Sequence, residues 1–103
     1  MAYVRYSAQA DADLLDIAAY PVATWGDRQA IRYLGQIEDC CRLIADKPQV
    51  GRACDYLHSG LRRMESGKHV VFYVVESDGG VLIARVIHQE MLPESDDFGD
   101  LDW

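Results

Sequence analysis

The feature that most constrains this sequence is a pair of apolar runs joined by a tight-turn segment. Residues 68–76 (Lys-His-Val-Val-Phe-Tyr-Val-Val-Glu) and residues 81–88 are rich in valine, isoleucine or aromatic side chains, which favour β-strands. Between them lies Ser-Asp-Gly-Gly, whose glycines tolerate the positive φ angles of a hairpin turn. The two runs therefore predict an antiparallel hairpin.

Strict alternation leaves both faces of this hairpin apolar. The first strand divides into two sets, Val70, Phe72 and Val74 against Val71, Tyr73 and Val75. The second strand divides in the same way, with Leu82, Ala84 and Val86 opposite Val81, Ile83 and Ile87. Helices can cover one face, and an exposed apolar face of this size marks a partner site. The alternatives are that the C-terminal tail or a second copy of the chain covers it.

Two helices are predicted ahead of the hairpin. A short strand over residues 2–6 is followed by Ser7, a candidate N-cap, and the first helix is ended or kinked by Pro21. Asp27 is the candidate N-cap of a second helix over residues 28–46, which Lys-Pro stops. The second helix carries one apolar stripe at helical spacing: Ala30, Tyr33, Leu34, Ile37, Cys41 and Ile44.

The remaining residues complete an α+β fold. Residues 47–60 form a loop that is long for a compact domain and is therefore either functional or partly structured, and residues 61–65 form a strand. The order is strand, helix, helix and three-stranded meander, with the helical hairpin packed on a small antiparallel sheet. We expect a single domain over residues 1–93 of the 103, followed by an acidic tail over residues 94–103.

Charge is concentrated in that tail. The chain has ten basic and seventeen acidic residues, and the last ten residues hold five of the acids and no base. The body is thus close to neutral, which argues against direct nucleic-acid binding through a basic face. The apolar runs are too short to span a bilayer, and the N-terminal residues lack the apolar region of a signal peptide. We therefore expect no membrane partner and a cytoplasmic location.

The cysteines and histidines do not predict a catalytic or metal centre. Three cysteines in a cytosolic chain are expected to be reduced thiols. A zinc site would combine Cys40 or Cys41 with Cys54 and His58, but this spacing fits no common zinc pattern. No arrangement typical of a hydrolase triad is evident either, so no cofactor and no metal are expected.

Several short motifs, in this order and at these separations, resemble the ParE toxins of the RelE/ParE toxin–antitoxin superfamily. They are Trp25-Gly26, Asp46-Lys47-Pro48, Gly51-Arg52, Gly60-Leu61-Arg62, the run Ser66 to Tyr73, and the run Arg85 to Met91. The resemblance covers residues 3–93 and implies a helical hairpin on a small sheet. It also implies a partner, a ParD-type antitoxin that wraps over the toxin, and a target, DNA gyrase. RelE relatives instead cut messenger RNA on the ribosome.

The residues favour binding over catalysis. The resemblance implies that a ribonuclease of this superfamily uses basic side chains on the sheet and a tyrosine or histidine in the tail. Here His69 stands where that branch tends to have arginine, Glu90 follows the His-Gln pair, and no tyrosine follows Met91. A carboxylate at Glu90 would repel phosphate. We therefore expect a gyrase-directed toxin that is not an enzyme; the alternatives are a ribosome-dependent endoribonuclease and a toxin-like binding module without activity.

The residues that we expect to contact the target or the antitoxin are Arg62, Arg63, His69, Phe72, Tyr73, Arg85, His88 and Met91. Strict alternation places Arg85 on the face of Ile83 and Ile87, where an arginine requires a carboxylate partner, either internal or from the antitoxin. The acidic tail has three interpretations. It is solvated, or its apolar residues fold back over the open sheet face, or it contacts a basic partner.

Overall fold

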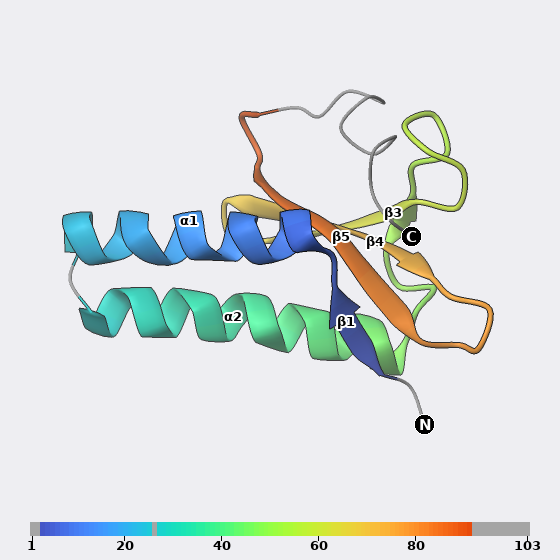
Figure 1. Ribbon diagram of the computed structural model, residues 1–103, viewed down its shortest axis with the longest axis horizontal. Coiled ribbons are helices and arrows are strands. Elements are labelled where there is room, and N and C mark those ends of the chain that lie inside the picture. Colours follow the sequence, from blue (N-terminus) through green and yellow to red (C-terminus); the bar gives the residue numbers. More distant parts are fainter. Residues whose placement is uncertain (1–2, 26, 92–103) are drawn as a thin grey trace.

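The computed structural model describes residues 3–25 and 27–91, with the side chains of residues 20–27 left out of the description. Its elements follow the predicted order (Figure 1). They are β1 (Val4–Tyr6), α1 (Ala8–Trp25), α2 (Asp27–Asp46), β2 (Arg52–Ala53), β3 (Arg62–Ser66), β4 (His69–Val75) and β5 (Val81–His88). The tail predicted over residues 94–103 lies outside the described residues.

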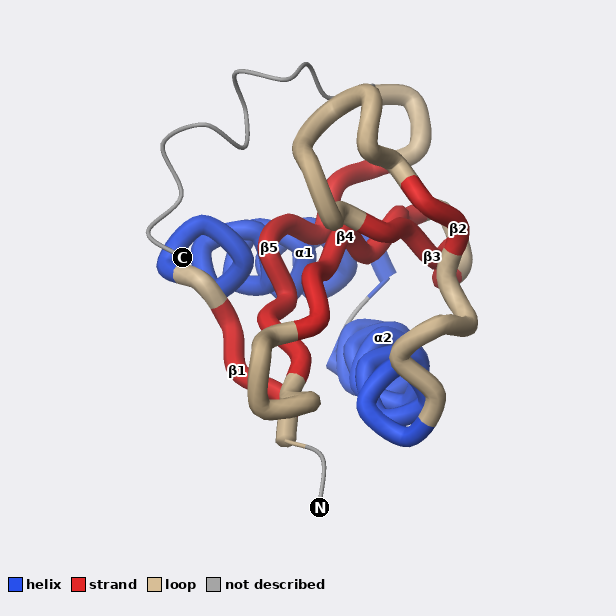
Figure 2. The backbone as a smooth tube through the Cα atoms, turned by 90° about the vertical axis from the view of Figure 1, so that its right-hand side faces the viewer, coloured by secondary structure: helices blue, strands red, loops and turns tan. Residues whose placement is uncertain are grey.

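The strands form one mixed sheet in the order β1-β5-β4-β3-β2. Neighbouring strands are antiparallel except at one edge, where β1 runs parallel to β5. A parallel pair needs a crossover connection, and the helical hairpin between β1 and the meander provides it. The helices lie side by side (Figure 1), and the loop before β3 lies on the other side of the sheet from α2 (Figure 2). The α+β fold class is confirmed, but the prediction that the sheet is antiparallel is wrong at β1, which runs parallel to β5.

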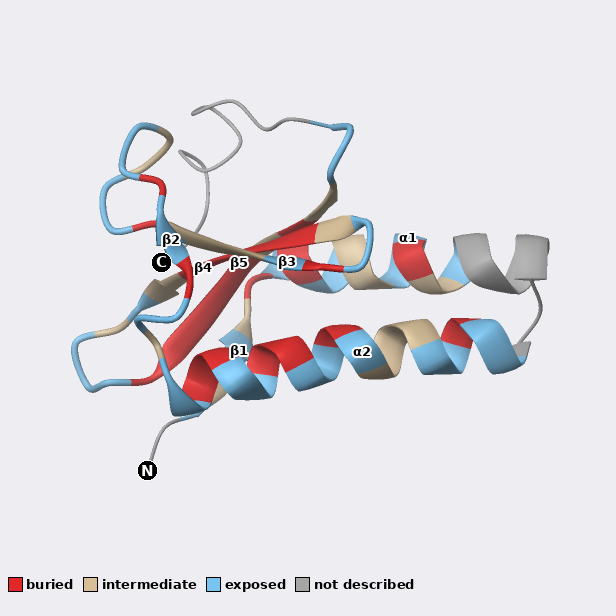
Figure 3. Cartoon of the chain, turned by 180° about the vertical axis from the view of Figure 1, so that it is seen from behind, coloured by how far each residue is buried: buried red, intermediate tan, exposed pale blue. Residues whose placement is uncertain are grey.

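The helix boundaries agree with the sequence except at Pro21. Ser7 caps α1, because its Oγ accepts a hydrogen bond from the amide of Ala10 at 3.0 Å. The predicted stripe of α2 faces the sheet, with Ile37 and Ile44 almost fully buried (Figure 3). Of the two effects predicted for Pro21, an end of α1 near residue 20 is wrong, since α1 continues to Trp25; a kink stays a prediction. A proline removes one backbone hydrogen bond of a helix, and the turns on either side can still form.

The main core lies between the helices and the sheet. It joins Ile17, Ile37 and Ile44 of the helices to strand residues that include Val71 and Ile83. None of the described helices combines the length and the hydropathy that a bilayer crossing requires.

Tyr73 is fully buried in this core and anchors the loop that follows α2. Its hydroxyl donates to the carbonyl of Pro48 at 2.7 Å and accepts from the amide of Gly51 at 2.9 Å. The loop is therefore held from beneath by a buried tyrosine.

A β-bulge in β5 changes which side chains share a face. Phe72 pairs with Arg85 and Tyr73 pairs with Ile83, so Ala84 is an extra residue in β5. The alternation shifts by one position there. The prediction that Arg85 shares a face with Ile83 is therefore wrong, because Arg85 pairs with Phe72 whereas Ile83 pairs with Tyr73, whose side chain lies on the other face. Val86 correspondingly packs in the helix-side core.

The second face of the sheet is not the exposed apolar face that the sequence predicts. Residues 54–61 fold over part of it, closed by a hydrogen bond from the amide of Cys54 to the carbonyl of Leu61 at 2.7 Å. Cys54 and Leu61 form a second buried cluster with Val70, Phe72 and Ala84. The loop over residues 47–60 is thus partly structured, and it contributes β2.

The three cysteines lie in separate parts of the fold. Cys40 and Cys41 belong to the helix-side core, whereas Cys54 belongs to the second cluster across the sheet. All three are free thiols, and burial raises the pKa of Cys40 to about 11. Among the described residues, no three His, Cys, Asp or Glu side chains gather as metal ligands would.

Candidate functional site

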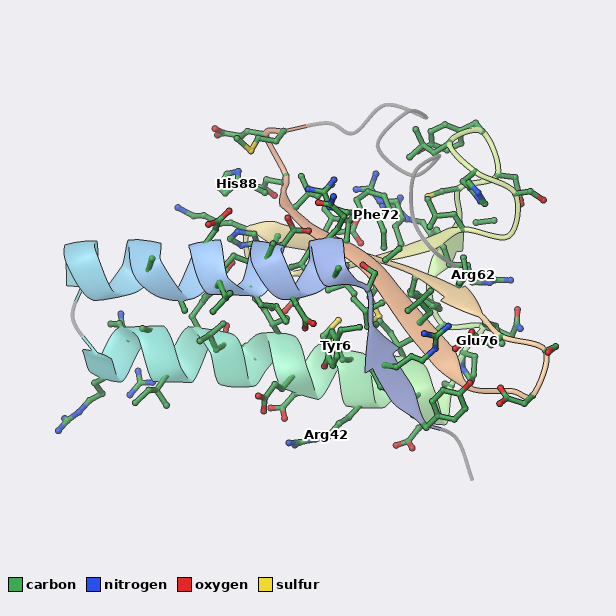
Figure 4. The ribbon with its side chains drawn as sticks, viewed as in Figure 1. Tyr6, Arg42, Arg62, Phe72, Glu76 and His88 are labelled. Atoms are coloured by element: carbon green, nitrogen blue, oxygen red, sulfur yellow. The ribbon has the colours of Figure 1, made fainter. Side chains whose placement is uncertain are left out.

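Two surfaces of different character stand out. The first, which we call the hairpin groove, runs along α1 and α2 beside β1 and has a volume of about 480 Å³. Tyr6 points between the helices from the β1 side (Figure 4). The groove is lined by Tyr6, Asp11, Leu14, Leu15, Ala18, Leu34, Ile37 and Glu38.

The hairpin groove has an apolar lining and two carboxylates. Leu15, which lies outside the core-facing stripe of α1, is 72% exposed. Asp11 and Glu38 contribute the carboxylates, one from each helix. An apolar groove of this kind suits an amphipathic segment, and the carboxylates favour basic residues in it. The sequence analysis missed this surface. The sequence signal for it was Leu15, which directly follows Leu14 of the core-facing stripe and therefore points to another side of α1.

The second surface, which we call the open face, is the side of the sheet away from the helices, beyond the cover of residues 54–61. Ile87 and Val74 are partly exposed there beside the second cluster. A small hollow lies on it near the end of β5, and Met91, at the end of the described chain, is 68% exposed. The hollow is lined by Arg63, Val70, Phe72, Ile87, His88, Gln89 and Met91.

Arg63 borders the hollow with an unsatisfied donor. Its guanidinium carbon lies 5.8 Å from the centre of the Phe72 ring, and its Nη2 donates to Glu65 at 3.1 Å. Its Nε is buried and finds no acceptor among the described residues. Glu65 is also paired with Arg52. Burial alone would raise the pKa of Glu65, but a backbone hydrogen bond and the two guanidinium groups together lower it.

Arg62 is engaged by the loop after α2. Its Nη1 donates to the carbonyl of Gly51 at 2.6 Å, and its Nη2 donates to the side-chain oxygen of Gln49 at 2.5 Å. Both acceptors are neutral, so the positive charge of Arg62 is not balanced by them. Figure 4 shows Arg62 near the β2 end of the sheet.

Arg85 finds its carboxylate within the chain. Its Nε and Nη2 donate to the two oxygens of Asp13 at 2.8 and 2.9 Å. The same carboxylate accepts from the backbone amide of Val86 at 2.9 Å. The side chains of Arg85 and Asp13 are 20% and 13% exposed. Of the two partners considered for Arg85, the internal one is therefore present.

The rings of His69 and His88 are in contact beside α2. Their ring centres are 5.2 Å apart in an edge-to-face arrangement. The Tyr33 hydroxyl accepts from the amide of Lys68 at 3.1 Å and lies 2.5 Å from His69 Nδ1. Burial, and then the charge of His88, lower the pKa of His69, while Asp13 opposes them. The lowered pKa favours the neutral ring, whose Nδ1 can accept the hydrogen of the Tyr33 hydroxyl.

The structure brings together only part of the predicted site. Four of the eight residues, Arg63, Phe72, His88 and Met91, line the hollow on the open face. Phe72 is 1% exposed and forms its floor from beneath. His69 adjoins His88, whereas Arg62 and Arg85 are held by Gly51 and Asp13. Nothing in this arrangement tests whether these residues contact a partner.

Comparisons with known proteins place the fold and the sequence in one family. The family described as "ParE toxin of type II toxin-antitoxin system, parDE" matches residues 4–93. A curated toxin ParE1 of Caulobacter vibrioides is 42% identical over 87 residues, which cover 84% of this chain and 88% of that protein. Toxin ParE1 of Mycobacterium tuberculosis (strain CDC 1551 / Oshkosh) is 36% identical over 85 residues, covering 82% and 87%.

Solved structures agree on the fold. A chain from the chromosomal ParDE toxin–antitoxin system of P. aeruginosa has a TM-score of 0.73 at 18% identity, covering 85% of this chain and 96% of that one. A chain of the complex RelBE2 from Mycobacterium tuberculosis has a TM-score of 0.61 at 19% identity, covering 84% and 96%. The fold, the motifs and the two curated relatives lead to one conclusion: the chain belongs to the ParE family of toxins of type II toxin–antitoxin systems.

Proposed function

We propose that this toxin inhibits DNA gyrase by binding to it, without catalysis of its own, and that a ParD-type antitoxin neutralises it. Membership in the ParE family supports the toxin role. The structural relative from P. aeruginosa is part of a ParDE system, which supports a ParD-type partner for this chain. A gyrase target also implies a cytoplasmic location.

The observation that carries the non-catalytic part is the state of the sheet arginines. A ribonuclease needs cationic groups to stabilise a phosphorane and a poised acid or base. Arg62 and Arg85 donate to acceptors within the chain, and Arg63 donates to Glu65. Arg85 is thus neutralised by Asp13 and His69 is held by Tyr33, which favours a toxin that acts by surface contact.

The hairpin groove is the surface that we assign to the antitoxin. It is apolar along its length, and Asp11 and Glu38 contribute carboxylates. An antitoxin segment with apolar residues at helical spacing and basic residues beside them would bury Leu15 and pair with both carboxylates. The same carboxylates would repel an acidic segment.

A supercoiling assay tests the target. Full-length toxin, freed from its antitoxin and refolded, is added to purified gyrase with relaxed plasmid and ATP. Blocked supercoiling, or cleaved plasmid trapped with gyrase, at toxin amounts stoichiometric with gyrase is expected. Unaffected supercoiling by a folded toxin, together with cleavage of ribosome-bound message, would replace the proposal with the endoribonuclease alternative. No effect in either assay would favour a binding module without activity.

A matched pair of substitutions tests the antitoxin surface. Leu15 and Ile31 are each 72% exposed, but only Leu15 lines the hairpin groove. Losing the burial of one leucine is worth about 1.5–3 kcal/mol, so Leu15→Asp should weaken antitoxin binding by roughly tenfold to a hundredfold. Ile31→Asp should leave the dissociation constant unchanged in calorimetric titration. Equal effects of the two substitutions would remove the groove from the interface.

A further inference from the structure

We propose that the open face is the docking site of the chain's own C-terminal segment, residues 92–103, which lies outside the described residues. The proposal does not depend on gyrase or on the antitoxin. It rests on where the described chain ends, on the charge of the open face, and on the composition of the segment.

The described chain ends beside the site. Met91 lines the hollow on the open face, together with Arg63 and Ile87. Twelve residues follow it, and an extended chain of that length reaches about 40 Å. The longest dimension of the molecule is 39 Å. Every part of the open face is therefore within reach of the segment, and its effective concentration there is high because it is tethered.

The open face carries an excess of positive charge at its border. Arg52 and Arg63 share the single carboxylate of Glu65, so that carboxylate balances only one of their two positive charges. A carboxylate brought to this border would balance the remaining charge.

The segment has the matching composition. It contains five acidic residues and no basic residue. Three apolar side chains, Phe98, Leu101 and Trp103, are interleaved with these acids. The apolar side chains fit Ile87 and Met91 at the hollow, and the acids fit the neighbouring arginines. This division between apolar side chains and a charged edge is the usual anatomy of a small interface.

Charge also excludes the competing surface within the chain. The hairpin groove is apolar as well, but Asp11 and Glu38 line it, and like charges placed together there would oppose docking of an acidic segment. The two apolar surfaces are thus distinguished by the sign of their neighbouring charges, and the acidic segment fits only the open face.

The fluorescence of Trp103 tests the proposal in the full-length chain. The chain has two tryptophans, so Trp25→Phe leaves Trp103 as the sole emitter. Acrylamide quenching of Trp103 should be severalfold weaker than in a synthetic peptide of residues 92–103, and its emission should be shifted to the blue. Because the contact includes exposed ion pairs, quenching should increase as salt is added.

Variants locate the contact. Arg63→Met should raise quenching towards the peptide value, whereas Arg42→Met should not, because Arg42 pairs only with Glu38 and Asp39 among the described residues. Arg42 lies on the side of α2 away from Phe72 (Figure 4). Circular dichroism reports whether Arg63→Met keeps its fold. The tail variant Asp97→Asn/Asp100→Asn/Asp102→Asn leaves the body intact and should also raise quenching.

Three results would overturn the proposal. The first is quenching of Trp103 in the full chain that is as strong as in the peptide. The second is protection of Trp103 that stays unchanged both in folded Arg63→Met and in the variant with the neutralised tail. That result would place the segment elsewhere. Protection that disappears on dilution would show that a second copy of the chain, and not the tethered segment, covers Trp103.

Discussion

Replacing Asp13 should be the most damaging single change among the polar residues of α1. Its carboxylate accepts two hydrogen bonds from Arg85 and one from the amide of Val86. Ser7, which follows β1, makes a neighbouring contact with the same strand. Its Oγ donates to the carbonyl of Ala84 in β5 at 2.7 Å. Asp13 therefore joins α1 to the part of β5 that lies beyond its pairing with β1.

The expected cost follows from burial. Breaking a fully buried ion pair costs about 3–5 kcal/mol, whereas an exposed pair is worth about 0–1 kcal/mol. The side chains of Asp13 and Arg85 are 13% and 20% exposed, so the pair is closer to the buried limit. The amide of Val86 also loses its acceptor. Asp13→Ala should therefore lower the free energy of unfolding by about 3 kcal/mol, which corresponds to a fall in Tm of roughly 12–24 °C.

Urea unfolding at pH 7, followed by circular dichroism, measures this cost. Asp16→Ala is the matched control, because Asp16 lies on the same helix but is exposed. A double-mutant cycle with Arg85→Ala separates the ion pair from the other contacts of Arg85, and its coupling energy should be about 1–3 kcal/mol. If Asp13→Ala and Asp16→Ala unfold at the same urea concentration, the carboxylate does not stabilise β5 and the reasoning fails.

Three further predictions concern the other anchors of the sheet. Gly67→Ala should destabilise more than Gly79→Ala: both have positive φ, but a Cβ at Gly67 would lie 2.9 Å from the Tyr33 ring, whereas Gly79 has open space. Equal urea midpoints would contradict this. Tyr73→Phe should cost about 1–3 kcal/mol by leaving buried backbone groups unsatisfied, as measured by thermal melting. Because burial lowers the pKa of His69 from 6.5, the unfolded chain binds its proton more tightly. Stability should therefore fall as pH drops below about 6.5, and His69→Asn should flatten that dependence in urea titrations at several pH values.

Much of the fold could be predicted because its signals are local. The Asp-Gly-Gly turn, the apolar runs and the stripe of α2 each depend on residues close together in sequence, and the structure has the corresponding elements. Pro21 shows the limit of such signals. A single proline disfavours the helix locally, but packing against a neighbouring element can retain the helix around it.

The bulge at Ala84 could not be predicted, because its contacts come from residues far away in sequence. The amide of Ser7 donates to the carbonyl of Ile83 at 3.0 Å, and the Ser7 hydroxyl donates to Ala84. Asp13 then accepts from Val86. The sequence shows that Arg85 needs a carboxylate, but it contains seventeen acidic residues and does not identify Asp13 among them. The same shift moved Arg85 and Val86 to the faces opposite to those predicted.

The candidate site was partly predictable for a related reason. Motif resemblance selects residues that the family retains, and it does not separate those that hold the fold from those that face a partner. Tyr73 illustrates the first kind, since its hydroxyl contacts only loop backbone groups among the described residues. Leu15 illustrates a surface residue that carries no motif.

The two apolar surfaces differ most in charge, and that difference has a consequence for how the toxin is held in check. A basic-flanked antitoxin segment fits the hairpin groove with Asp11 and Glu38, whereas an acidic segment fits the open face with Arg63. The two surfaces lie on opposite sides of the sheet, so both segments can be bound at once. Antitoxin binding should therefore leave the Trp103 signal of the full-length chain unchanged. A target that competes for the open face would instead release the tail, and gyrase binding would then raise Trp103 quenching while antitoxin binding would not.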